Sequence, residues 1–231
     1  MKKIFLVANW KSHKTLSEAH LWMQEFLSHD FASYLHVVSG HEPTDKRIII
    51  CPPFTLLSSM HDLVSSSPLS LPLKIGAQNV SPFDEGAHTG EEPARILHEF
   101  AQYVLIGHSE RRKQFNETDE ILDRKVKAAR EHHIEPIFCV QNKETLVPDG
   151  VHIVAYEPTE AIGSGHPEDA KSANEVAKYF KEEKDIPYVL YGGSVTDENV
   201  RDFTTQAYLD GVLVGNASLD AKEFSQIIQK A

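Results

Sequence analysis

Short apolar segments recur along the whole chain, and most are separated by stretches long enough to hold a helix. Near-continuous apolar runs of this length fit strands that are covered on both faces, as in parallel sheets. The sequence predicts eight such strands, at residues 4–9, 47–51, 73–79, 103–107, 136–140, 152–156, 188–192 and 211–215.

The segments between the apolar runs carry helical periodicity. Thr15 and Glu18 have the Thr-x-x-Glu spacing of a capping box. The apolar residues that follow recur on one helical face, at Leu16, Ala19, Trp22, Met23 and Phe26. Further helices are predicted over residues 168–183, 197–205 and 220–229.

A helix is also predicted between the fourth and fifth strands. Asn116 or Thr118 can cap it. Its apolar stripe comprises Ile121, Leu122, Val126 and Ala129. We expect the aliphatic stem of Lys125 at the margin of this stripe, with its charge toward solvent.

Eight strands alternating with helices predict an α/β fold, a closed (β/α)8 barrel that forms one domain over residues 1–231. An open doubly wound sheet is the alternative architecture. Residues 30–46 are longer than the second strand needs and are expected to form an added loop. Residues 141–151 are too short for a helical crossover, so the helix after the fifth strand is expected to be shortened or missing.

Composition and charge indicate which partners and which cellular location to expect. The chain has 23 basic and 34 acidic residues, a net charge of −11, and no basic stripe, so nucleic acid is not an expected partner. No apolar run approaches the length of a membrane span or a signal-peptide core, so a cytoplasmic protein is expected. Cys51 and Cys139 lie in separate apolar runs and are expected as reduced, buried thiols.

Polar side chains follow five of the predicted strands. In a (β/α)8 barrel the active site forms at the carboxyl ends of the strands, so groups at these positions converge on one mouth. Those groups include Asn9, Lys11, His108, Glu110 and Glu157.

Two glycine-containing loops follow the seventh and eighth strands. Gly192-Gly193-Ser194 and Gly215-Asn216 leave backbone amides open to an anion, and these loops often bind phosphate in barrels. Gly163 and Gly165 lie in a segment that can close over such a group and exclude water. Either glycine pair alone is explained by tight turns, whereas both together favour phosphate.

The remaining groups suit proton transfer. A carboxylate such as Glu157 can remove a proton from the carbon beside a carbonyl, and the resulting oxyanion needs donors such as a neutral His108 and Lys11. The sequence shows no metal-ligand set, so the chemistry is expected to need no cofactor. The residues therefore predict proton transfer on a small phosphorylated aldehyde or ketone.

Each residue taken alone has a simpler interpretation. Lys11 suits an exposed strand end, His108 a bonded core histidine, and Glu110 a surface ion pair with Arg111 and Arg112. Glu157 before Pro158 suits a solvated strand end. Only the placement of all four residues at one end of the barrel favours a catalytic site over these simpler interpretations.

Six motifs in order together resemble the triosephosphate isomerase family, and their spacing runs through essentially the whole chain. They are NWK (9–11), GAQNV (76–80) with GAHTGE (86–91), IGHSERR (106–112), AYEP…AIGSG (155–165), YGGSV (191–195) and LVGNASL (213–219).

The resemblance implies a TIM barrel that interconverts dihydroxyacetone phosphate and D-glyceraldehyde 3-phosphate, in glycolysis and gluconeogenesis, without a cofactor. By motif, Glu157 is implied as the base and His108 as the neutral electrophile; the family is a known case of pKa tuning in an active site. Lys11 is implied as the cation, Asn9 as a donor to substrate and Glu110 as the partner of Lys11. The family's phosphate contacts fall on Gly163, Ser194, Gly215 and Asn216.

The resemblance also implies an assembly. The GAHTGE loop at residues 86–91 resembles an interface loop that reaches the neighbouring subunit near Asn9 and His108. A homodimer is therefore expected, and the surface exposed by the shortened helix could support a tetramer.

Four positions depart from the usual family pattern. They are Thr159-Glu160 after the Glu-Pro pair, Asn216 in the second phosphate loop, Gln141-Asn142 after the fifth strand, and Pro93 after the TGE motif. The first two leave room for a phosphate-binding barrel without isomerase activity. An enzyme that acts on a different sugar phosphate is a further alternative. The compact phosphate loops argue against it, because they leave room for only a short substrate.

Overall fold

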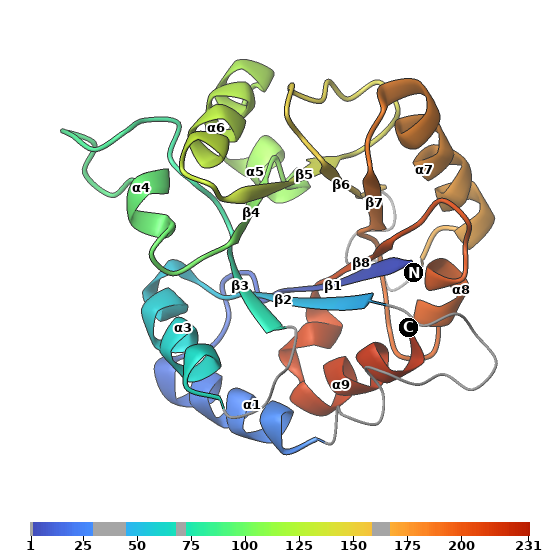
Figure 1. The fold of residues 1–231 in the computed structure, drawn as a ribbon, viewed down its shortest axis with the longest axis horizontal. Coiled ribbons are helices and arrows are strands. Elements are labelled where there is room, and N and C mark those ends of the chain that lie inside the picture. Colours follow the sequence, from blue (N-terminus) through green and yellow to red (C-terminus); the bar gives the residue numbers. More distant parts are fainter. Residues whose placement is uncertain (1, 30–44, 68–72, 159–166) are drawn as a thin grey trace.

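Eight parallel strands pair in sequence order into a closed ring (Figure 1). The computed structural model describes residues 2–29, 45–67, 73–158 and 167–231. The predicted barrel is confirmed, and the open sheet is wrong. The strands are β1 Lys3–Asn9, β2 Asp45–Cys51, β3 Leu73–Ala77, β4 Tyr103–Ile106, β5 Glu135–Val140, β6 Ile153–Tyr156, β7 Tyr188–Tyr191 and β8 Gly211–Val214.

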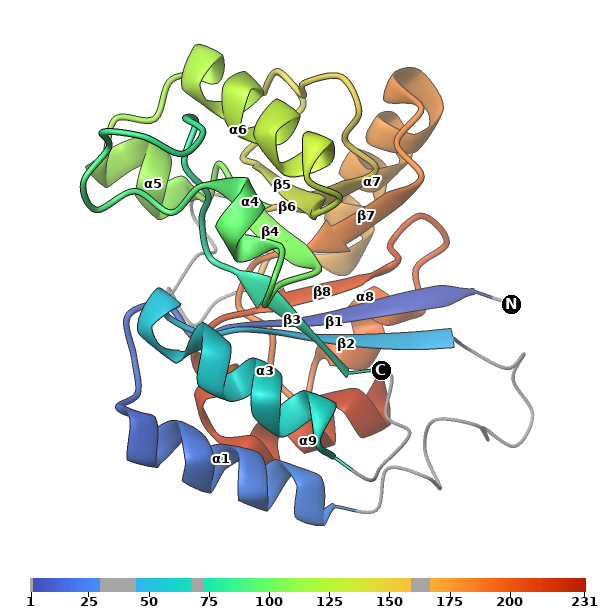
Figure 2. The same cartoon turned by 60° about the vertical axis from the view of Figure 1, so that its left-hand side comes forward.

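Helices surround the ring and run outside the strands (Figures 1 and 2). They are α1 Leu16–Ser28, α3 Leu57–Ser65, α4 Ala94–Leu97, α5 Ser109–Gln114, α6 Asp119–Glu131, α7 Ala170–Lys184, α8 Val200–Thr204 and α9 Ala221–Lys230, with short 3-10 turns η1 Phe54–Leu56 and η2 Asn216–Leu219. Residues 141–152 connect β5 to β6 without a helix, as predicted, and pass between α6 and α7 (Figure 1).

The predicted caps start two of these helices. Glu18 N donates to Thr15 Oγ1 at 3.4 Å and Thr15 N donates to Glu18 Oε2 at 2.7 Å, which completes the capping box of α1. Thr118 caps α6 by accepting from Ile121 N, while Asn116 takes a left-handed backbone with φ 53°.

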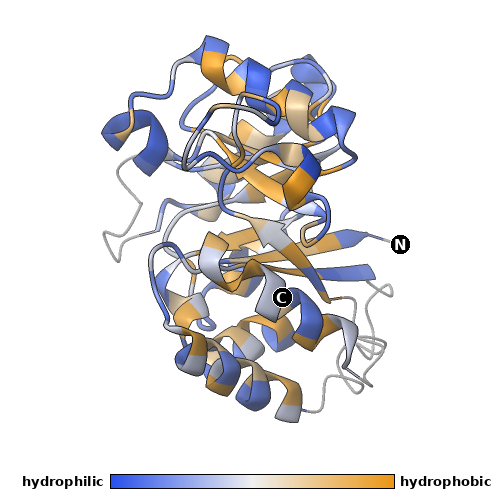
Figure 3. Cartoon of the chain, turned by 90° about the vertical axis from the view of Figure 1, so that its left-hand side faces the viewer, coloured by the Kyte–Doolittle hydropathy of each residue, from blue (hydrophilic) through white to orange (hydrophobic). Residues whose placement is uncertain are grey.

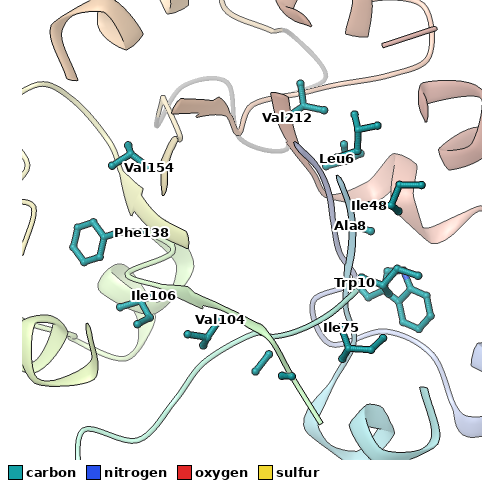
Figure 4. Packing of buried hydrophobic residues seen from close by; sticks show 14 of the residues in the cluster. Leu6, Ala8, Trp10, Ile48, Ile75, Val104, Ile106, Phe138, Val154 and Val212 are labelled. Carbon is teal, nitrogen blue, oxygen red and sulfur yellow. The ribbon is translucent and has the colours of Figure 1, made fainter. Parts of the chain in front are cut away.

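Side chains alternate between two apolar layers along each strand. In β1, Phe5 and Val7 face the barrel interior, while Leu6 and Ala8 face the helices. Figure 4 shows outward side chains of this second layer, among them Trp10, Ile106 and Val154. Figure 3 shows the strands largely hydrophobic and the helices mixed, because each helix buries only one face.

The ring closes where β8 meets β1, and a glycine is required there. Phe5 N donates to Asp210 O at 2.8 Å, and Phe5 pairs with Gly211. A Cβ at Gly211 would lie 1.9 Å from Phe5 O, and its φ of +145° also favours glycine. Any side chain at this position would push the closing strands apart.

Two expectations from the sequence are wrong. Asp45 and Lys46, placed in the added loop, belong to β2, because they pair with Lys3 and Ile4 of β1. Residues 30–44 of that loop lie outside the described residues.

Lys125 is not at a solvent margin, since only 3% of it is exposed. Its Nζ lies 2.5 Å from Glu117 Oε1 and 2.6 Å from Asn79 Oδ1. A buried ammonium is tolerated when it is paired and hydrogen-bonded in this way.

Lys46 should make stability depend on pH. It is 2% exposed, its Nζ donates to Ile228 O at 2.7 Å, and burial lowers its pKa from 10.5 to about 8. The unfolded chain therefore keeps this proton between about pH 8 and 10.5 while the folded chain loses it, so this lysine makes stability rise with pH across that window.

We expect Lys46→Met to abolish that part of the rise, as measured by urea unfolding of both proteins across the window. Lys74→Met, which removes an exposed lysine from β3, is the control for the loss of one charge. Parallel pH profiles for wild type and Lys46→Met would contradict the prediction.

Candidate active site

The polar groups predicted at the strand ends line one cavity of about 690 Å³ at the carboxyl rim of the barrel. Its wall includes Asn9, Lys11, His108, Glu157, Ser194, Gly215 and Asn216. Glu110 joins the site through Lys11. Gly163, Gly165 and the Thr159-Glu160 pair lie outside the described residues.

Lys11 is held in an unusual backbone conformation after β1. Its φ of 52° is left-handed, which costs free energy for a residue with a side chain. Two hydrogen bonds hold it: Asn9 Oδ1 accepts from Lys11 N at 3.0 Å, and Gln78 Nε2 donates to Lys11 O at 2.9 Å. Lys11 Nζ then lies 2.7 Å from Glu110 Oε1, so the cation is paired at the cavity wall.

His108 is fixed in one tautomer at the start of α5. Its Nδ1 accepts a hydrogen bond from Glu110 N at 3.2 Å, which leaves the ring proton on Nε2. Nε2 lies 3.1 Å from Glu157 Oε1. Glu110 Oε2 is 3.7 Å from Nδ1, but a nitrogen that already accepts an N–H has no proton to give it. His108 therefore presents a neutral N–H donor to the cavity.

Glu157 follows β6 and is only 1% exposed, so the interpretation as a solvated strand end is wrong. Its Oε2 accepts from Ser109 N at 3.0 Å, and its main-chain N donates to Val140 O at 2.8 Å. A buried carboxylate requires such donors, because desolvation of an unpaired charge is costly.

The sequence did not place Cys139 or Gly192 beside Glu157; it indicated them only as a buried thiol and as part of a phosphate loop. Cys139 is buried beside Glu157: burial first, and then the charge of Glu157, raise the pKa of this thiol well above its usual range. It therefore stays protonated and able to donate. Gly192 provides space, because a Cβ there would lie 2.9 Å from Glu157 Cγ. Cys139 belongs to the layer of β5 that faces the barrel interior, whereas Phe138 and Val140 face the helices. The sequence indicated only that this thiol is buried.

Gln78 was also missed as a positioning group. Its Nε2 donates both to Lys11 O and to Cys51 O, each at 2.9 Å, so it joins the loop after β1 to the end of β2. Both cysteines are buried and free, as predicted.

The two glycine-containing loops lie at the same cavity wall as Lys11. A Cβ built at Gly215 would be 3.9 Å from Lys11 Nζ, so this backbone lies close to the cation. Gly193 packs so closely that a Cβ there would be 2.2 Å from the hydroxyl of Tyr191. The arrangement therefore combines a carboxylate, a neutral N–H donor, a paired cation and two loop backbones around one cavity.

Comparisons with known proteins agree on one family. The sequence model described as triosephosphate isomerase matches residues 4–152 and 147–231. The triosephosphate isomerase of Dictyoglomus turgidum is 36% identical over 262 residues, covering 99% of this chain and 100% of the relative. That of Gloeobacter violaceus is 37% identical over 252 residues, covering 99% and 98%.

Gly192→Ala should displace the Glu157 carboxylate. The added methyl group would lie 2.9 Å from Glu157 Cγ, so Oε1 should move beyond its 3.1 Å separation from His108 Nε2. A crystal structure of the variant checks this. Gly215→Ala is the control, since its methyl group meets Lys11 Cε at an ordinary 3.6 Å. If Glu157 does not move in Gly192→Ala, the prediction is wrong, and the ends of the two strands must have moved apart to accommodate the methyl group.

Proposed function

Because the chain belongs to the triosephosphate isomerase family, we propose that Glu157 is the base that carries a proton between two adjacent substrate carbons. The chain is an isomerase that interconverts dihydroxyacetone phosphate and D-glyceraldehyde 3-phosphate, a step of glycolysis. One observation supports the assignment above all: buried Glu157 and the neutral donor His108 lie 3.1 Å apart in a cavity that Lys11 also lines.

The first step is removal of a proton by Glu157 from the carbon beside the carbonyl. The electron pair of that C–H bond forms a carbon–carbon double bond, and the carbonyl oxygen becomes an oxyanion. His108 Nε2–H and Lys11 Nζ are the donors that stabilise this developing charge. Asn9, which is 5% exposed and bonded to Lys11 N, adds a side-chain amide beside them.

Substrate must take over a contact that Glu157 makes in the free protein. His108 Nε2 carries a single proton, and that proton faces Glu157 Oε1. A substrate carbonyl that accepts this N–H displaces the carboxylate from it. The freed carboxylate then returns the proton to the neighbouring carbon. The hydroxyl on the first carbon becomes the aldehyde carbonyl as its proton passes to the oxyanion, which becomes the new hydroxyl, and this converts ketose to aldose.

Glu110 acts on the cation and not on the substrate. Its ion pair with Lys11, at 2.7 Å, holds the ammonium at the wall shared with Gly215. Ser194, Gly215 and Asn216 are proposed to bind the phosphate group, with Gly163 from outside the described residues. Backbone amides suit this role because they donate without adding a charge that must be desolvated.

We also propose that the whole chain, residues 1–231, acts as one domain in the cytoplasm, where glycolytic enzymes work. Within the described ranges, no helix has the length and apolar character needed to cross a membrane.

Glu157→Gln should abolish the base while preserving the shape of the side chain. We expect isomerisation to slow by at least ~10²-fold, since a positioned base contributes that much or more. Coupled-enzyme assays in both directions measure it. Retained binding of phosphoglycolate by the variant is the control for an intact cavity. A folded wild type that binds phosphoglycolate without turnover would instead favour a binding module.

A homodimer is proposed to form through residues 86–91. This loop projects beyond the barrel between β3 and α4 (Figure 2), and residues 83–91 are exposed. Phe83 is 40% exposed and stacks on His88 with ring centroids 4.3 Å apart.

Light scattering at micromolar concentration should give twice the chain mass of 25.9 kDa. His88→Asp, which places a charge in the loop, should shift the mass toward the monomer. A measured mass of four chains would indicate a second interface, for which the surface between α6 and α7 is the candidate. A monomeric wild type would contradict the proposal.

A further inference from the structure

Arg112 connects the ends of β4 and β5 to the start of α6. Its guanidinium meets three acceptors on different segments: Nε donates to Gly107 O at 2.8 Å, Nη2 to Cys139 O at 3.3 Å and Nη1 to Asp119 Oδ1 at 3.0 Å. A planar guanidinium holds several acceptors in a fixed arrangement, which the single ammonium of a lysine cannot do. The sequence suggested Arg112 only as a surface ion-pair partner of Glu110, whereas the structure pairs it with Asp119.

Packing also fixes the guanidinium. Only 17% of the Arg112 side chain is exposed, and its guanidinium carbon lies 5.4 Å from the centre of the Phe138 ring. Phe138 belongs to the outward layer of β5 (Figure 4). Gly107 leaves the space free, because a Cβ there would lie 3.0 Å from Arg112 Nη2 and 3.3 Å from Nε.

The peptide that Arg112 holds leads directly into His108. Gly107 has a left-handed φ of +74°, and His108 is the N-cap of α5. Arg112 binds both carbonyls of this turn, since its side chain donates to Gly107 O and its main-chain N donates to His108 O at 3.1 Å. Rotation of the peptide between Gly107 and His108 would turn the imidazole, so the direction of Nε2 depends on these bonds.

The same guanidinium links His108 to the strand that holds Glu157. Cys139 O, which accepts from Arg112, lies one residue before Val140 in β5. Val140 O in turn accepts from Glu157 N at 2.8 Å. The strand end that carries His108 is therefore joined to the strand on which the main chain of Glu157 is bonded, and the two side chains lie 3.1 Å apart.

We propose that Arg112 is a positioning residue for the reaction: its guanidinium holds Gly107 O and Cys139 O and so fixes the direction in which His108 presents its N–H to the substrate. This inference rests on the proposed role of His108 as the donor to the carbonyl oxygen. Arg112 is not among the described residues that line the cavity, and it is not proposed to touch substrate.

The test compares Arg112→Met and Arg112→Lys with wild type by steady-state kinetics. Both variants should lower kcat about 10-fold, because small displacements of a reacting group are costly. KM and the inhibition constant of inorganic phosphate should change less than about two-fold, since the phosphate loops follow β7 and β8 and make no bond to Arg112. Arg112→Lys keeps the charge but should be about as slow as Arg112→Met, because one ammonium cannot bridge both carbonyls.

Two control variants separate positioning from stability and from charge. Asp119→Ala removes the acceptor of Arg112 that is 54% exposed and leaves the two carbonyl contacts, so it should lower the melting temperature while kcat stays near wild type. Arg201→Met removes an exposed arginine from α8 and should leave both quantities near wild type.

A double variant tests whether Arg112 acts through His108. In a His108→Gln background the imidazole is gone, so adding Arg112→Met should lower kcat by less than about two-fold. If Arg112→Met does not fold, Arg112→Lys takes its place in this comparison, because it keeps the charge and most of the side-chain volume.

Wild type and His108→Gln are assayed alongside to distinguish two kinds of failure. An inactive wild type, or a fully active His108→Gln, would overturn the role of His108 and this inference with it. If those two behave as proposed, the inference alone is overturned by unchanged kcat in Arg112→Met, by wild-type kcat in Arg112→Lys, or by a full further loss in the double variant. A rise in the phosphate inhibition constant as large as the fall in kcat would also overturn it, since that indicates a general loosening of the site.

Discussion

Closure of the eight parallel strands into a ring is the constraint on which the site depends. Parallel strands place all their carboxyl ends at one rim, and a closed ring brings the ends of β1, β4, β6, β7 and β8 around one cavity. The last pairing, between β8 and β1, is possible because Gly211 has no side chain to meet Phe5 O. Lys11 and Gly215 are separated widely in sequence but become neighbours through it.

Within that ring, main-chain groups set the direction of the reactive side chains. Glu110 N fixes the tautomer of His108, and Ser109 N holds the carboxylate of Glu157. Both amides lie in the first turn of α5, where helix N–H groups have no partner in the helix itself. The main-chain amides of one short helix thus hold both His108 and Glu157, the residues proposed as donor and base.

Much of the fold could be predicted from the sequence because its signals are local. The capping box at Thr15 and Glu18 and the apolar runs of the strands depend on neighbours in the chain. The helix missing after β5 follows from the length of residues 141–151 alone. Each predicted strand was misplaced by one or two residues at one end, since ladder bonds and not composition determine where pairing stops.

The features of the site that could not be predicted from the sequence are contacts between distant segments. Gln78 and Gly192 lie in the family motifs and Cys139 in an apolar run, but their neighbours in the chain do not reveal the atoms that they meet across the barrel. Lys125 was misassigned for the same reason: its partners Glu117 and Asn79 lie eight and 46 positions away. The strand-end residues were found because strand ends can be located from the chain, and the family motifs suggested the roles that are proposed for them.

The central claim is that one carboxylate, Glu157, moves a proton between carbons without a hydride step. Isomerisation of dihydroxyacetone phosphate in D2O, followed by NMR of the product, tests it most directly. A proton held on a carboxylate can exchange with solvent, so deuterium should appear on the carbon that receives it. Product formed at full rate without any deuterium would indicate direct hydrogen transfer between the carbons and contradict the account.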